Sequence, residues 1–141
     1  MTPDVKLIEI SEYRDEGYRP LVTYDAWRVA ILNFTDELLP ENLKQMQRHE
    51  KTDEVFVLLQ GRCILFLGEG DQTVEKIHAV DMQPLKYYNI KKYCWHNHTL
   101  STDAAVLIVE NDDTCDANSP LIDVSPSQTE EMVQLTAQLW K

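Results

Sequence analysis

Residues 47–61 of the chain are QRHEKTDEVFVLLQG, a polar segment followed by a dense apolar run. Gln47 and His49 are two residues apart, so in an extended strand their side chains project from the same face and can reach one target. Glu54 opens the apolar run after a polar turn, so its carboxylate can approach His49 across the bend. Gly61 permits the tight backbone turn that folds the following strand back. We therefore expect Gln47, His49 and Glu54 to share one inward-facing site.

The same stretch resembles the first sequence motif of the cupin superfamily. That motif has two histidines separated by one residue, then three or four residues, a glutamate, six residues and a glycine. His49, Glu54 and Gly61 match it, and Gln47 stands at the first histidine position. The second motif of the family supplies a further histidine from a later strand, for which His96 is the best match. The residues around His96 lack the proline, glycine and asparagine of that motif, and the resemblance spans residues 27–110.

The resemblance implies an all-β fold, a single cupin-type double-stranded β-helix or jelly-roll barrel. In the family, the matching residues coordinate a divalent metal, and members include dioxygenases, sugar isomerases, epimerases and non-enzymatic sensors. Two histidines and one carboxylate leave open positions on a divalent ion for substrate or oxygen. The implied ligands are His49, Glu54 and His96, and the ion is Fe, Mn, Ni or Zn. Gln47 would add a neutral oxygen ligand or hydrogen-bond a metal-bound water.

The rest of the chain also has the pattern of short strands. Trp27, Val29 and Ile31 alternate with polar or small residues, which predicts a half-buried strand with these three side chains inward. The apolar runs 55–59 and 63–67, joined at Gly61, predict a hairpin buried on both faces. Further strands are expected at 73–80, 86–90, 93–99 and 104–110. Such spacing favours a sandwich or closed barrel over a parallel sheet.

The two ends of the chain differ from this core. Residues 1–24 are expected to form an extended arm, either an early strand or a segment wrapped on a neighbouring subunit. Ser125, Pro126 and Gln128 have the spacing of a helix start, so an amphipathic helix is expected over 125–140. We expect one domain over 1–141, with its barrel core at 25–111. The arm and the apolar helix together predict a homodimer.

Composition limits the partners and the compartment. A formal net charge of −11 repels phosphate backbones and anionic headgroups, so neither nucleic acid nor a membrane is an expected partner. The first residues lack the basic start and apolar core of a secretory signal, which predicts a cytoplasmic protein. The three cysteines have no C-x-x-C spacing and are expected to be small buried side chains.

Some residues have alternative interpretations. Cys94, His96 and His98 alternate along one strand and form a rival ligand set for a softer ion such as zinc. His78 is expected to be structural. The aromatic residues Tyr87, Tyr88, Tyr93 and Trp95 can line a pocket, although core packing is favoured.

A guanidinium group matches the geometry of a carboxylate or phosphate, so the arginines are candidates for binding an anionic substrate: Arg28, Arg48 and Arg62. Arg48 has the opposite strand parity to His49, and Arg28 alternates with the apolar residues of its strand. Both are therefore expected to point away from the site, and no arginine is assigned a role.

The leading hypothesis is a metal-dependent cupin that acts on or senses a small polar organic molecule. The alternative is a metal-free barrel that binds a small molecule without catalysis, as the glutamine at position 47 permits.

Overall fold

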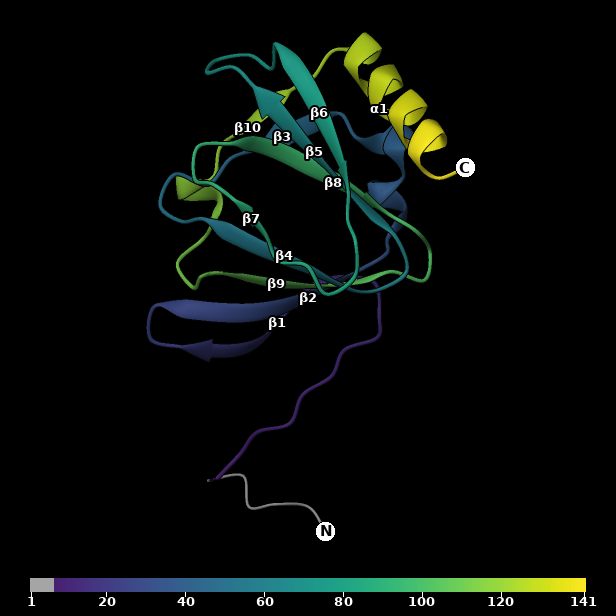
Figure 1. Cartoon of the computed structure of the whole chain (residues 1–141). Helices are drawn as coiled ribbons and strands as arrows, with labels where there is room; N and C mark the ends of the chain where they lie inside the picture. The colour runs from purple at the N-terminus through teal and green to yellow at the C-terminus, as the bar shows by residue number, and fades with distance from the viewer. Residues whose placement is uncertain (1–6) are drawn as a thin grey trace.

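The structure, a computed structural model, describes residues 7–141 and is built mainly from short antiparallel strands (Figure 1). The elements of this part of the chain are β1 (Gly17–Tyr24), β2 (Trp27–Asn33), β3 (Gln45–Gln47), β4 (Glu54–Gln60), β5 (Cys63–Glu69), β6 (Lys76–Asp81), β7 (Tyr88–Ile90), β8 (Trp95–Leu100), β9 (Ala105–Asn111), β10 (Leu121–Asp123) and the helix α1 (Pro126–Leu139). Three short 3-10 turns, Asp36–Leu38, Pro40–Asn42 and Asp116–Asn118, lie in the connections.

The strands form two five-stranded antiparallel sheets, in the orders β1-β2-β9-β4-β7 and β10-β3-β8-β5-β6. Buried apolar side chains from both sheets meet in one core, including Leu32 and Phe56 from the first and Leu65 and Leu100 from the second. Removing this apolar surface from water is the main force that holds the sheets face to face. The arrangement confirms the predicted all-β jelly roll with a C-terminal helix.

The runs around Gly61 do not form the predicted hairpin. β4 pairs with β9 and β7, whereas β5 pairs with β8 and β6 in the other sheet. Gly61 has a φ of +73°, and a Cβ there would lie 2.6 Å from the Ala104 Cα. The glycine does make a tight turn, but the turn carries the chain from one sheet to the other. β5 is nonetheless buried on both faces, because Cys63 and Leu65 point into the space between the sheets and Ile64 and Phe66 pack in the cluster that includes Met132 of the C-terminal helix.

The predicted inward face of β2 is also wrong. Ala30 and Leu32 are the buried side chains, 1% and 5% exposed, whereas Trp27 is 43% exposed. Arg28 has the same parity as Ala30 and Leu32, so it points inward. Both faces of this strand carry apolar residues, so alternation alone could not identify the buried one.

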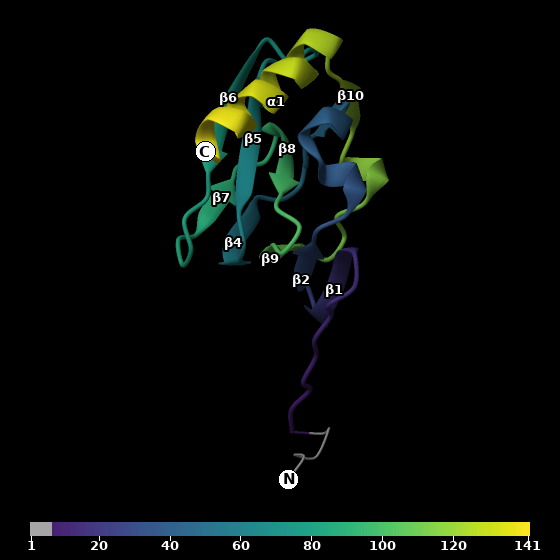
Figure 2. The ribbon, with the colours of Figure 1, turned by 90° about the vertical axis from the view of Figure 1, so that its right-hand side faces the viewer.

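The early strand, one of the two alternatives for the N-terminal segment, is present and precedes the expected barrel core. β1 falls within the expected arm and pairs along its length with β2, with a bulge between Pro20 and Val22. Residues 7–16 carry no strand, and the chain leads away from the two sheets (Figures 1 and 2). Residues 1–6 of the expected arm lie outside the described residues.

Helix α1 begins as its sequence predicts. The Ser125 side chain accepts a hydrogen bond from the Gln128 backbone, and the Gln128 side chain accepts one from the Ser125 backbone. Met132 is fully buried in a second apolar cluster, with Ile64 and Phe66 of β5. The helix therefore covers the outer face of the second sheet (Figure 2). No helix in residues 7–141 is both long and apolar enough to span a membrane.

Candidate metal centre

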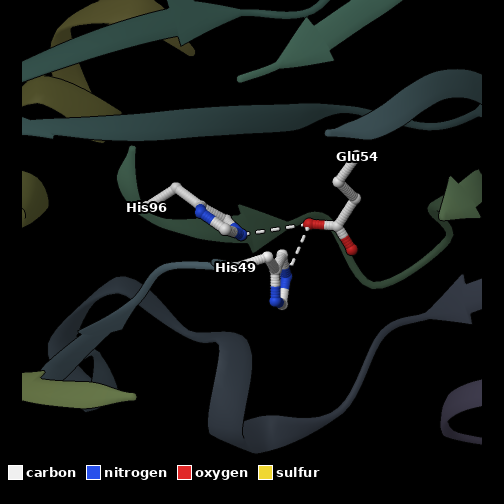
Figure 3. A group of neighbouring side chains, drawn as sticks. All are labelled: His49, Glu54 and His96. Carbon is white, nitrogen blue, oxygen red and sulfur yellow. Dashed lines mark hydrogen bonds and ion pairs between the residues drawn. The ribbon is translucent and has the colours of Figure 1, made fainter. Parts of the chain in front are cut away.

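His49, Glu54 and His96 meet between the two sheets (Figure 3). The Glu54 Oε1 lies 3.2 Å from the His49 Nε2 and 3.0 Å from the His96 Nε2. All three residues are buried, with exposures of 8%, 6% and 5%. One ligand atom from each lies within 4.8 Å of the others. The structure thus brings together the three residues expected as ligands.

The strand pairing explains this convergence. Gln47 of β3 pairs with His96 of β8, and His49 follows two residues later in the adjoining loop. The Tyr93 backbone N–H donates to the His49 carbonyl at 2.9 Å, which holds that loop beside β8. Glu54 is the first residue of β4 in the facing sheet. The carboxylate therefore approaches the two imidazoles from the opposite side of the jelly roll.

Hydrogen-bond partners fix the tautomers of both histidines. The His96 Nδ1 lies 3.0 Å from the Cys94 carbonyl, which can only accept, so this nitrogen carries the proton. The His49 Nδ1 lies 2.7 Å from the Ser119 Oγ, whose own hydrogen is donated to the Asn118 Oδ1. The His49 Nδ1 is therefore also the donor. In the neutral rings, both Nε2 lone pairs then face the Glu54 carboxylate.

The environment keeps Glu54 ionised. Burial raises the pKa of this carboxyl, but the hydrogen bonds with His49 and His96 outweigh burial and hold the pKa well below its usual range. For His49, burial lowers the pKa, but the hydrogen bond and charge of Glu54 outweigh it and raise the pKa. The site is therefore an anionic centre that favours a positive charge at the His49 Nε2.

A second carboxylate, Glu110 of β9, lies beside this centre. Its Oε1 accepts hydrogen bonds from the Tyr18 hydroxyl at 2.7 Å and the Arg28 Nη2 at 2.8 Å. Its Oε2 lies 3.9 Å from the His49 Nε2. Burial, together with the neighbouring Glu54 carboxylate, raises the pKa of Glu110. Arg28, expected to point away from the site, is thus part of its wall.

A cavity of about 330 Å³ opens beside the centre. Its walls come from both sheets and from the loop that precedes β10, and consist of Tyr18, Arg28, Leu32, Gln47, His49, Glu54, His96, His98, Ile108, Glu110, Thr114, Cys115, Asp116 and Ser119. Gln47 lines this cavity, and its amide Nε2 donates to the Ser119 carbonyl at 2.9 Å. The volume suits a small organic molecule.

The rival set of Cys94, His96 and His98 does not assemble. His98 lines the same cavity as His96, but Cys94 lines a different one. Burial lowers the pKa of His98 to about 4, so its ring is neutral near pH 7. Its Nδ1 is buried with no hydrogen-bond partner among the described residues.

Other candidate residues lie outside the centre. His78 pairs with Glu69 at the surface, Arg48 stacks on Trp95, and Arg62 pairs with Asp81. The aromatic residues do not share one environment. Trp95 is a core residue, but Tyr87 and Tyr93 are 80% and 53% exposed, so the core-packing expectation is wrong for these two. Of the cysteines, Cys63 is buried and Cys115 is exposed at the cavity rim, which departs from the expectation for Cys115.

Sequence reasoning missed Glu110, Tyr18 and Ser119. A signal for Glu110 was present, because it shares strand parity with the buried Val106 and Ile108. An ionisable residue on the apolar face of a strand requires a polar partner or a site. Tyr18 and Ser119 have no comparable local signal, since each reaches the centre from a distant part of the sequence.

Two five-stranded sheets packed as a jelly roll, with a histidine and carboxylate cluster between them, are consistent with a cupin-like fold. No protein-family model and no curated protein sequence matches this chain. Among solved structures, it is similar to the nucleoside dehydratase Pac13 from Streptomyces, at a TM-score of 0.57 and 8% identity, over 82% of this chain and 88% of that one.

Sugar-nucleotide enzymes have a similar fold. The QdtA 3,4-ketoisomerase from Thermoanaerobacterium thermosaccharolyticum, a double mutant in complex with TDP, has a TM-score of 0.53 and 15% identity, over 70% of this chain and 67% of that one. WlaRA, a TDP-fucose-3,4-ketoisomerase from Campylobacter jejuni, has a TM-score of 0.51 and 16% identity, over 68% and 67%. At these identities the likeness establishes the cupin-type fold alone.

Proposed function

We propose that this chain binds one divalent metal ion through the Nε2 atoms of His49 and His96 and the Glu54 carboxylate. One observation carries the proposal. Three buried ligand atoms, one from each residue, lie within 4.8 Å of one another, and the Nδ1 of each ring is held by a neighbour, which leaves the Nε2 atoms directed at Glu54. A divalent ion among the three atoms would replace the protons of these hydrogen bonds and be attracted to the same carboxylate. The donor set of two imidazoles and one carboxylate suits Fe, Mn, Ni or Zn.

The metal-bound protein would act on or sense a small polar organic molecule in the adjoining cavity. The bound ion would supply a Lewis acid or an oxygen-activating centre. Ser119 and the Cys94 carbonyl hold the imidazole rings in their ligating orientation. Two structural neighbours were solved with uridine and TDP, which supports a polar organic ligand.

Metal content tests the proposal directly. We expect elemental mass spectrometry of the tag-free protein, reconstituted with each of the four ions, to find about one equivalent per chain, because the three donors surround a single position. H49A and H96A should each lose this metal. H78A is the matched control, since His78 lies at the surface beside Glu69, and it should retain the metal.

The alternative function is a metal-free binding module. It is favoured by Gln47, whose amide is held by the Ser119 carbonyl and offers no imidazole to an ion. A protonated His49 Nε2 would then donate its hydrogen to Glu54. Native protein that takes up none of the four ions, together with ligand binding that is unaffected by a chelator, would establish this alternative.

A further inference from the structure

The two oxygens of the Glu110 carboxylate have opposite surroundings. The Oε1 accepts three hydrogen bonds, from the Tyr18 hydroxyl at 2.7 Å and from the Arg28 Nη2 and Nε at 2.8 and 3.3 Å. The Oε2 is buried and has no hydrogen-bond partner among the described residues. The side chain as a whole is only 3% exposed. All the hydrogen-bond donors that contact this carboxylate are therefore on one oxygen. The other lies near the Glu54 carboxylate, and a cation between the two carboxylates would offset their mutual repulsion.

This orientation of Glu110 is fixed by its neighbours. Besides the ion pair, the Arg28 guanidinium donates to the backbone carbonyls of Asp112 at 3.1 Å and Thr114 at 3.2 Å. Arg28 is thereby anchored in the loop that follows β9 and cannot turn to the second oxygen without breaking these bonds. A buried carboxylate oxygen without a partner costs free energy, so a folded protein rarely retains one without a use.

The free oxygen faces the metal centre. The Glu110 Oε2 lies 3.9 Å from the His49 Nε2. Nitrogen and oxygen ligands lie about 2.1 Å from an ion such as zinc, so two ligands of one ion are separated by about 3.0 Å at a right angle and about 4.2 Å when opposite. The separation from the His49 Nε2 falls within this interval. The group of ligand atoms that all lie within 4.8 Å of one another contains His49, Glu54 and His96 but not Glu110, so the Oε2 has to shift toward the ion to bind it.

We propose that Glu110 is a fourth protein ligand of the metal, through its Oε2. This inference rests on the proposed metal-binding function. Gln47 stands where a fourth ligand would be a histidine, and it has no imidazole. Glu110, on β9, would supply that fourth ligand instead. The centre would then consist of two histidines and two carboxylates. Two carboxylates balance the charge of a divalent ion in a buried site, and oxygen donors favour harder ions such as Mn²⁺. Tyr18 and Arg28 are positioning residues, since they act through Glu110.

The test is calorimetric titration of Mn²⁺ into native protein, E110Q and E69Q. Loss of Glu110 as a ligand should weaken Mn²⁺ binding in E110Q by at least about tenfold. Removing a residue that only hydrogen-bonds to a metal ligand already costs about tenfold or more in metal affinity. E69Q makes the same chemical change at a site where the side chain is 61% exposed, and should bind as the native protein does.

A crystal structure of the native protein soaked with Mn²⁺ gives a second readout. It is needed because E110Q leaves the Arg28 charge without its partner and can therefore destabilise the fold. We expect the Oε2 at a bonding distance of about 2.2 Å from the ion. An ion held by His49, Glu54 and His96 with the Oε2 outside bonding distance would overturn the inference.

The two proposals fail in different ways. Native protein that takes up no ion would overturn the proposed function, and the inference with it. Native protein that binds Mn²⁺ while folded E110Q binds it equally well would overturn only the role of Glu110.

Discussion

Ser119 determines which nitrogen of His49 faces the centre. Its hydroxyl donates to the Asn118 Oδ1 and accepts from the His49 Nδ1 at 2.7 Å, and the residue is only 3% exposed. Such outer partners of a metal-binding imidazole fix the orientation of the ring and raise its basicity. The Ser119 hydroxyl thus connects the loop before β10 to His49, the proposed ligand that follows β3.

S119A should weaken metal binding without unfolding the protein. With the acceptor removed, the His49 ring is free to rotate or change tautomer, so we expect metal affinity to fall about 10–100-fold. Competition against a chromophoric chelator measures this change. S127A, at the exposed first turn of α1, is the matched control and should leave affinity unaltered. Equal affinities of S119A and native protein would contradict the role given to Ser119.

At the scale of elements, the turn between β4 and β5 connects the two sheets along the chain. Gly61 is left-handed, and a side chain there would collide with the Ala104 backbone at 2.6 Å. Gly17, at the start of β1, is also left-handed, with a φ of +88°, but has no atom within 4 Å of an added Cβ. An alanine at position 17 therefore changes stability only through the backbone conformation, whereas an alanine at position 61 adds a steric clash.

G61A should destabilise the protein more than G17A does. G17A is expected to lower the free energy of unfolding by about 1–2 kcal/mol, the cost of a left-handed backbone in an L residue. G61A should lose more, because the backbone of Ala104 cannot move aside as a flexible side chain can. Urea unfolding of both variants without added metal measures the difference. Equal losses would show that the turn relaxes to accept the methyl group.

At the scale of the whole molecule, two features are suited to self-association. The described part of the arm exposes Leu7, Ile8 and Ile10, at 83%, 48% and 75%. β1 is the edge of its sheet and pairs on only one side, with β2. Exposed strand edges and apolar segments recruit other chains. We therefore retain the homodimer as a prediction and assign its contact to the arm and β1.

Light scattering at micromolar concentration should give the mass of a dimer for the native chain. The triple variant L7S/I8S/I10S should shift the mass toward the monomer, because its arm no longer offers apolar side chains to a partner. L139S removes an exposed apolar side chain of α1, 38% exposed, and should remain dimeric. A monomeric native chain would contradict the prediction, and a monomeric L139S would move the contact to the helix.

Much of this molecule is determined by short segments of sequence. Alternating and apolar runs separated by turn residues predicted most of the strands, and the Ser125, Pro126 and Gln128 spacing predicted the start of α1. The spacing of His49, Glu54 and Gly61 identified the region of the candidate centre. These features were readable because the interactions behind them, backbone conformation, capping and side-chain alternation, act within a few residues.

Tertiary structure alone decided the remaining features. β4 and β5 are adjacent in sequence yet belong to different sheets, and the inward face of β2 is the one that carries Arg28. Glu110 reaches its partner Tyr18 across 92 positions of the chain. Strand pairing and the choice of buried face depend on which distant segments bury the most apolar surface together. The parity of Glu110 indicated a buried carboxylate, but the identity of its distant partner depends on this balance of long-range contacts and cannot be read from either local segment.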